Sequence, residues 1–152
     1  MGMRRKGREI ALQTLYSLDY VETGAYLQEL ELLDKFREQL VDIAADQDID
    51  EENRIFLFAE DLIANVLRNL EPIDIQINGH STNWKVERLA LLDKSLLRIA
   101  TYELLFTDTA PAIVMNEAIE IAKKYCSESS GKFINGVLNG INEELTHAKN
   151  PC

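Results

Sequence analysis

The sequence contains little of what builds disulfide scaffolds, metal sites or membrane spans. Its two cysteines, Cys126 and Cys152, form no CxxC pair, which predicts no disulfide framework and fits a reducing compartment. Its two histidines, His80 and His147, lie far apart and are too few for a zinc site, so no metal is expected. No apolar run approaches the ~18 residues that span a bilayer. The basic N-terminus also lacks the apolar segment of a secretory signal, and we expect a cytoplasmic protein.

Common catalytic and cofactor motifs are also missing. The seven glycines form neither GxGxxG nor GxxxxGK[ST], and the sequence contains no HExxH and no GxSxG. The acidic residues are numerous but scattered along predicted helices, where a solvated surface is their usual place. We therefore expect no cofactor and no catalytic residues, and hence no enzyme.

Three prolines and seven glycines in 152 residues leave little room for long loops. Apolar residues recur at intervals of three and four nearly throughout, which predicts an all-α single domain of about seven helices over residues 1–152. A strand over 73–77 is rejected because no second strand could pair with it. The expected helical segments are residues 8–21, 26–45, 51–70, 73–77, a short one around 84–89, 93–105, 112–126 and a last one after the turn at 127–131.

The third of these segments carries three local expectations. Asp50 is the expected N-cap, with acidic residues 51 and 52 near the positive end of the helix. Phe58 is expected on the buried stripe together with Ile55, Ala59, Leu62, Val66 and Leu70. Pro72 must end or kink the helix, because its ring removes a hydrogen-bond donor.

The net charge of −10 is unevenly distributed. Residues 1–8 contain four basic residues and no acidic one, whereas the rest of the chain contains 12 basic and 26 acidic residues, a net charge of −14. A basic arm on an acidic body indicates binding to a polyanion, although a solvated terminus with incidental charge is the alternative. The cations of this basic arm are Arg4, Arg5, Lys6 and Arg8.

A second candidate for binding lies at residues 129–138, SSGKFINGVL. A flexible turn is expected to place Lys132 and Phe133 in the first turn of a helix, where backbone amides favour an anion and an aromatic ring can stack on a base. An aromatic residue at the start of an amphipathic helix also commonly belongs to the core, and this alternative stays open.

Four segments together resemble the NusB family: RRKGREIALQTLY at 4–16, LRIATYEL at 97–104, NEAIEIAK at 116–123 and KFINGVL at 132–138. The resemblance implies a NusB-like fold of two packed helical sub-bundles. It also implies a transcription antitermination factor that binds the single-stranded boxA element of nascent ribosomal RNA transcripts together with NusE, a small-subunit ribosomal protein, in an antitermination complex with RNA polymerase.

By this resemblance the basic arm contacts RNA, and Lys132 and Phe133 complete the RNA surface. Tyr16, Glu87 and Asp93 resemble positions on the side of the family that faces NusE. The sequence departs from the family at Gly7, where alanine is usual. Glycine costs about 1 kcal/mol in a helix interior, so we expect the arm to stay frayed until RNA binds.

Two other classes of function are considered. The same helical unit resembles the N-terminal domain of a ribosomal RNA cytosine methyltransferase, in which case this chain is the RNA-binding portion of an enzyme. Alternatively, the chain is a protein-interaction bundle whose basic arm is incidental.

Overall fold

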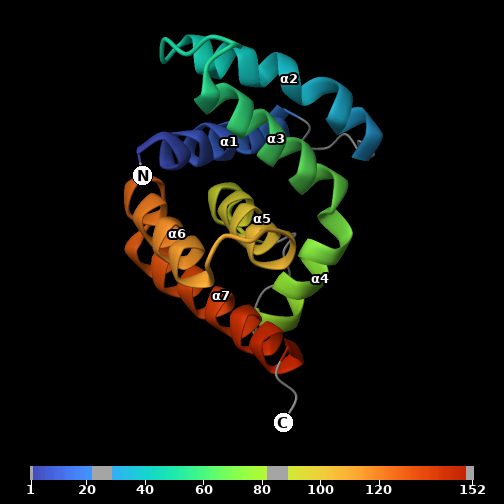
Figure 1. The fold of residues 1–152 in the computed structure, drawn as a ribbon, viewed down its shortest axis with the longest axis vertical. Helices are drawn as coiled ribbons and strands as arrows, with labels where there is room; N and C mark the ends of the chain where they lie inside the picture. The colour runs from blue at the N-terminus through green and yellow to red at the C-terminus, as the bar shows by residue number, and fades with distance from the viewer. Residues whose placement is uncertain (1, 22–28, 82–88, 150–152) are drawn as a thin grey trace. The chain divides into compact units, whose positions relative to one another are not determined.

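The computed structural model describes residues 2–21, 29–81 and 89–149, and the chain divides into two compact units, Met1–Leu70 and Glu71–Cys152 (Figure 1). The described residues form helices and contain no strand, which confirms the predicted all-α class. None of these helices is both long enough and apolar enough to cross a bilayer. The elements are α1 (Gly2–Val21), α2 (Glu29–Ala45), α3 (Arg54–Arg68), α4 (Leu70–His80), α5 (Leu91–Phe106), α6 (Pro111–Tyr125) and α7 (Glu128–Lys149).

In the first unit, α1, α2 and α3 each pack against the other two. Two polar contacts join α1 to α2 and to the turn that follows it. Ser17 Oγ donates to Gln39 Oε1 at 2.9 Å, and Gln47 Nε2 donates to Gln13 Oε1 at 2.9 Å. The core of this unit consists of apolar side chains from all three helices, among them Ile10, Leu12, Leu15, Leu18, Phe36, Leu40, Ala44, Phe56, Ala59, Leu62, Ile63 and Val66.

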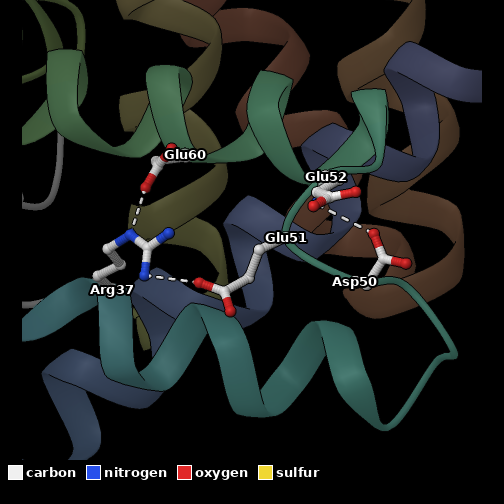
Figure 2. Close-up of polar contacts among 5 residues, drawn as sticks. All are labelled: Arg37, Asp50, Glu51, Glu52 and Glu60. Atoms are coloured by element: carbon white, nitrogen blue, oxygen red, sulfur yellow. Dashed lines mark hydrogen bonds and ion pairs between the residues drawn. The ribbon is translucent and has the colours of Figure 1, made fainter.

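An exposed ion-pair cluster joins α2 to α3 and to the segment before α3 (Figure 2). Arg37 of α2 places Nε 2.7 Å from Glu60 of α3 and Nη1 2.7 Å from Glu51. The same guanidinium lies over the Phe56 ring, 5.6 Å from its centroid. The hydrogen bonds that Arg37 donates to Glu60 and Glu51 raise the pKa of Arg37, although solvent screens the cluster and limits what it adds to stability.

The predicted N-cap of α3 was wrong. The helix begins at Arg54, and the side chain of Asn53 caps it by accepting from the amide of Ile55 at 2.8 Å. Asp50 instead accepts from the amide of Glu52 at 3.0 Å (Figure 2). The carbonyl of Asp50 accepts from the amide of Asn53. A separate hydrogen-bonded turn therefore precedes the helix.

The predicted buried stripe of α3 was right at Ala59, Leu62 and Val66 and wrong at Ile55 and Phe58. The buried side chains include Phe56, Ala59, Leu62 and Val66, whereas Phe58 is half-buried. Both stripes have helical spacing, and packing against α1 and α2 selects the one that contains Phe56.

In the second unit, α5, α6 and α7 pack against one another, and α4 is joined to them by side-chain contacts. Arg98 of α5 donates from Nε and Nη2 to the two carboxylate oxygens of Asp74 of α4, at 2.9 and 2.8 Å. Such two-point contacts are strong and fix geometry. The core of this unit includes Ile73, Ile77, Leu96, Leu97, Ile99, Val114, Ala118, Ile121, Ile134, Val137, Leu138 and Ile141.

The helix boundaries around this unit differ from those predicted. α3 ends at Arg68, and Pro72 lies in the first turn of α4, where a missing amide costs no helical hydrogen bond. The rejection of a strand over 73–77 is confirmed. The short helix predicted around 84–89 lies mostly outside the described residues. α7 begins at Glu128, because Ser127 Oγ accepts from the amide of Ser130 at 3.1 Å.

Gly140 of α7 marks a close approach between α7 and α4. A Cβ atom at Gly140 would lie 2.7 Å from Cδ2 of His80. The ring of His80 is held on both sides, because Nδ1 lies 3.0 Å from the carbonyl oxygen of Gln76 and Nε2 lies 3.0 Å from Glu144. The absence of a side chain at Gly140 is therefore required for this packing.

We expect Gly140→Ala to be less stable than Gly136→Ala, measured by urea unfolding followed by circular dichroism. In a helix interior, alanine is more stable than glycine by up to about 1 kcal/mol, which applies to both positions. At position 140 the overpacking against His80 costs about 1–3 kcal/mol. Nothing lies within 4 Å of a Cβ at Gly136, which makes it the matched control on the same helix. Equal stabilisation by both substitutions would contradict the close approach at Gly140.

Candidate nucleic-acid interface

The basic N-terminal segment is part of a helix. Residues 2–8 form the first two turns of α1, so the expectation of a frayed arm was wrong. Gly7 is buried, and a Cβ there would lie 2.5 Å from Cδ2 of the Phe58 ring. The loss of helix propensity at Gly7 is therefore offset by close packing between α1 and α3. The cations of this segment are consequently placed by helical geometry.

The four cations differ in exposure. Arg4 is exposed, Arg5 and Lys6 are half-buried, and Arg8 is 4% exposed. The guanidinium of Arg8 lies over the Phe58 ring, 5.6 Å from its centroid. Such burial leaves almost no surface of Arg8 for a ligand, and its side chain packs against α3. Arg4, Arg5 and Lys6 are therefore the better candidates for contacts with phosphate.

Lys132 lies at the edge of a groove between α6 and α7. It is exposed and sits in the second turn of α7, not in the first turn as predicted, because α7 begins at Glu128. The groove has a volume of about 250 Å³ and is lined by Ile119, Lys123, Ser127, Glu128, Gly131, Lys132 and Asn135. Phe133 is half-buried and is not among these residues.

A second lysine, Lys123, lines this groove and was not predicted from the sequence as a binding residue. Lys123 of α6 lines it beside Lys132 and forms an exposed ion pair with Glu120 at 2.9 Å. Lys123 ends the segment NEAIEIAK, and its place in a matched segment was the available signal. The predicted RNA residues therefore lie in both units: Arg4, Arg5 and Lys6 in the first, and Lys132 and Phe133 in the second.

The residues predicted to face the protein partner have different environments. Tyr16 of α1 is 38% exposed, as a contact residue requires. Asp93 lies in the first turn of α5 and accepts from Ser130 Oγ of α7 at 2.7 Å. The pKa of the Cys126 thiol is raised to about 12. Burial is the main cause, and the negative charge of Asp93 and a hydrogen bond to Asp93 add to it. Asp93 therefore joins α5 to the start of α7, and Glu87 lies outside the described residues.

Comparison with known sequences identifies close relatives over nearly the whole chain. The sequence model of the NusB family matches residues 5–143. The transcription antitermination protein NusB of Geobacter sulfurreducens is 44% identical over 146 residues, which cover 95% of this chain and 97% of that protein. NusB of Geotalea daltonii is 40% identical over 146 residues, with the same coverage.

Solved structures show the same fold. NusB of T. maritima superposes with a TM-score of 0.76 at 33% sequence identity, covering 93% of this chain and 91% of that one. A NusB chain crystallised with NusE and double-stranded RNA superposes with a TM-score of 0.77 at 27% identity, covering 95% and 98%. With its helical fold and its cationic first helix, the chain belongs to the NusB family of transcription antitermination proteins.

Proposed function

We propose that this chain is an RNA-binding transcription antitermination factor that binds boxA of nascent ribosomal RNA transcripts together with NusE and performs no catalytic step. The proposal is carried by the cationic first two turns of α1, which contrast with the net charge of −14 on the rest of the chain. It is supported by relatives that are antitermination proteins and by a structural neighbour that holds NusE and RNA. The place of action is then the cytoplasm, where the transcript and RNA polymerase meet.

The cations on the helix bind the phosphate backbone of the RNA. Arg4, Arg5 and Lys6 extend from consecutive positions of α1, and the fork of an arginine matches two phosphate oxygens. Lys132 supplies a fourth contact from α7. Four contacts on a single strand imply a salt slope of roughly −3, or about a 50-fold loss of affinity between 50 and 200 mM salt.

Selectivity for RNA sequence requires groups other than phosphate contacts. The groove between α6 and α7 offers the apolar side chain of Ile119 and the amide of Asn135 beside two lysines. An unstacked base could lie in such a groove and be read at its edge, which is how proteins commonly recognise single-stranded RNA. The half-buried Phe133 then supports the start of this surface from within α7.

The acidic body suits a basic protein partner. Ribosomal proteins such as NusE are basic, and complementary potentials raise the rate of encounter and reject wrong partners. Tyr16, with an exposed ring, and Asp93, at the start of α5, are the proposed contacts with NusE, together with Glu87. NusE and the chain then present a joint RNA surface to the polymerase complex.

The alternative of a methyltransferase fragment is less well supported. The relatives named above are antitermination proteins, and this chain covers 97% of each. A pure protein-interaction bundle predicts no dependence on the basic residues of α1. The experiment that separates it from our proposal is a titration of boxA RNA with and without NusE. We expect weak, salt-sensitive binding alone and tighter binding with NusE, for single-stranded boxA more than for a duplex of the same sequence.

The double variant Arg4→Gln, Arg5→Gln should bind boxA RNA roughly 10- to 30-fold more weakly near 0.1 M salt, because two phosphate contacts are lost. Its salt slope should become shallower by about 1.4. The matched control is Arg54→Gln, Arg68→Gln, which removes two exposed charges from α3 of the same unit. Fluorescence anisotropy at several salt concentrations measures both quantities. An equal loss in the control would show that net charge, and not the start of α1, governs binding.

Asp93→Asn should weaken binding to NusE while leaving the RNA affinity of the chain alone unchanged, because it removes a negative charge and keeps the shape of the side chain. Isothermal titration with purified NusE measures the first quantity. Asp108→Asn is the matched control, since Asp108 is an exposed acid just after α5. Loss of RNA affinity with unchanged NusE binding would show that Asp93 belongs to the RNA surface instead.

A further inference from the structure

The Phe58 ring lies at the basic end of α1. Phe58 comes from α3 and is half-buried, in contrast to the neighbouring Phe56, which is fully buried in the core. The guanidinium carbon of Arg4 lies 6.0 Å from the centroid of the Phe58 ring, and that of Arg8 lies 5.6 Å away. One aromatic ring therefore contacts two cations of the segment that we assign to RNA binding.

Helical spacing explains how one ring reaches both arginines. Arg4, Gly7 and Arg8 occupy positions i, i+3 and i+4 of α1 and share one face of the helix. Gly7 leaves this face open at its centre, since a Cβ there would lie 2.5 Å from Cδ2 of Phe58. The ring thus fits against the helix backbone at Gly7. It lies between Arg4 and Arg8, which are about one helical turn apart.

The two arginines differ in what this contact leaves available. Arg8 is 4% exposed, so it serves as a fixed neighbour of the ring. Arg4 is exposed and carries its charge to the surface. A cation over an aromatic face is held by the quadrupole of the ring and uses none of its N–H donors in doing so. The donors of Arg4 stay free for phosphate oxygens while the side chain is restrained.

We propose that Phe58 is a positioning residue for RNA binding, whose ring, fitted against Gly7, holds the guanidinium of Arg4 in place for a phosphate contact. This inference rests on the proposed RNA-binding function. An arginine on a helix surface loses rotamer freedom when it binds a phosphate, and a ring that restrains it beforehand reduces that loss. Phe58 therefore raises RNA affinity without touching RNA.

The test is a double-mutant cycle on the full chain, with Kd for boxA RNA as the readout. Phe58→Leu removes the ring and keeps an apolar side chain, and we expect a loss of affinity of about threefold, because the Arg4 side chain must then be ordered when RNA binds. Arg4→Gln should lose about fivefold, as one phosphate contact near 0.1 M salt. In the Arg4→Gln background, Phe58→Leu should have no further effect, because Phe58 acts through Arg4. Phe58→Tyr keeps the ring and should retain the affinity of the unchanged chain.

Gly7→Ala tests the same contact from α1, and it decides the matter if Phe58→Leu fails to fold. The added methyl group displaces the ring, so we expect a comparable loss of RNA affinity that disappears in the Arg4→Gln background. Leu57→Ala is the matched control, because Leu57 is a 50% exposed apolar residue next to Phe58 on α3, and it should leave affinity unchanged.

Each outcome bears on a different statement. If the unchanged chain ignores boxA RNA with and without NusE, the proposed function is overturned and this inference with it. If the unchanged chain binds RNA and Arg4→Gln weakens binding, but Phe58→Leu and Gly7→Ala do not, the function stands and the positioning role of Phe58 is overturned. Equal losses from Phe58→Leu with and without Arg4 would also overturn it, since the ring would then act by another route.

Discussion

The packing of α1 against α3 is the interaction on which the rest of the first unit depends. Ile10, Ala11 and Leu12 of α1 are fully buried, and α3 contributes Phe56, Ala59 and Ile63 to the same core. Burial of a large aliphatic side chain contributes about 1.5–3 kcal/mol, far more than the helix propensity of any single residue. The core therefore holds α1 as one helix from Gly2, despite a glycine at position 7 and a run of like charges.

This constraint changes the physical picture of the proposed RNA surface. A flexible basic arm would follow any phosphate backbone and would pay for its ordering at each encounter. A helix presents Arg4, Arg5 and Lys6 in fixed directions, and the cost of ordering the backbone has been met by folding. The same core removes Arg8 from the surface. The proposed surface thus depends on the arrangement of a few cations more than on their number.

In the second unit, polar contacts between helices have a comparable role. Arg98 and Asp74 connect α5 to α4, and Asp93 and Ser130 connect the first turn of α5 to the first turn of α7. The latter contact lies close in sequence to Ser127, Gly131 and Lys132, which line the groove between α6 and α7. The proposed protein surface and the proposed RNA surface of this unit therefore lie side by side at the start of α7, where a side-chain oxygen at position 93 accepts from Ser130.

Much of the fold follows from local sequence signals. Helical periodicity predicted α5, α6 and most of α1 and α2, and the lack of a partner strand excluded a strand at residues 73–77. Arg98 lies within the matched segment LRIATYEL, and it donates to Asp74, as a part-buried cation requires a partner. These features depend on neighbours along the chain or on a simple requirement that buried charges have partners, so they can be read from sequence.

What the sequence by itself determined is the all-α class, the approximate helices, the uneven charge and the family. Tertiary structure alone decided that Phe56 and not Phe58 enters the core, that Arg8 is buried while Arg4 is exposed, and that Gly7 is a packing position. The physical reason is that periodicity places residues on a helix face but does not say which helix covers that face. Rotating a helix about its axis by one residue position moves a side chain from the core to the surface, and the partner helices set that rotation.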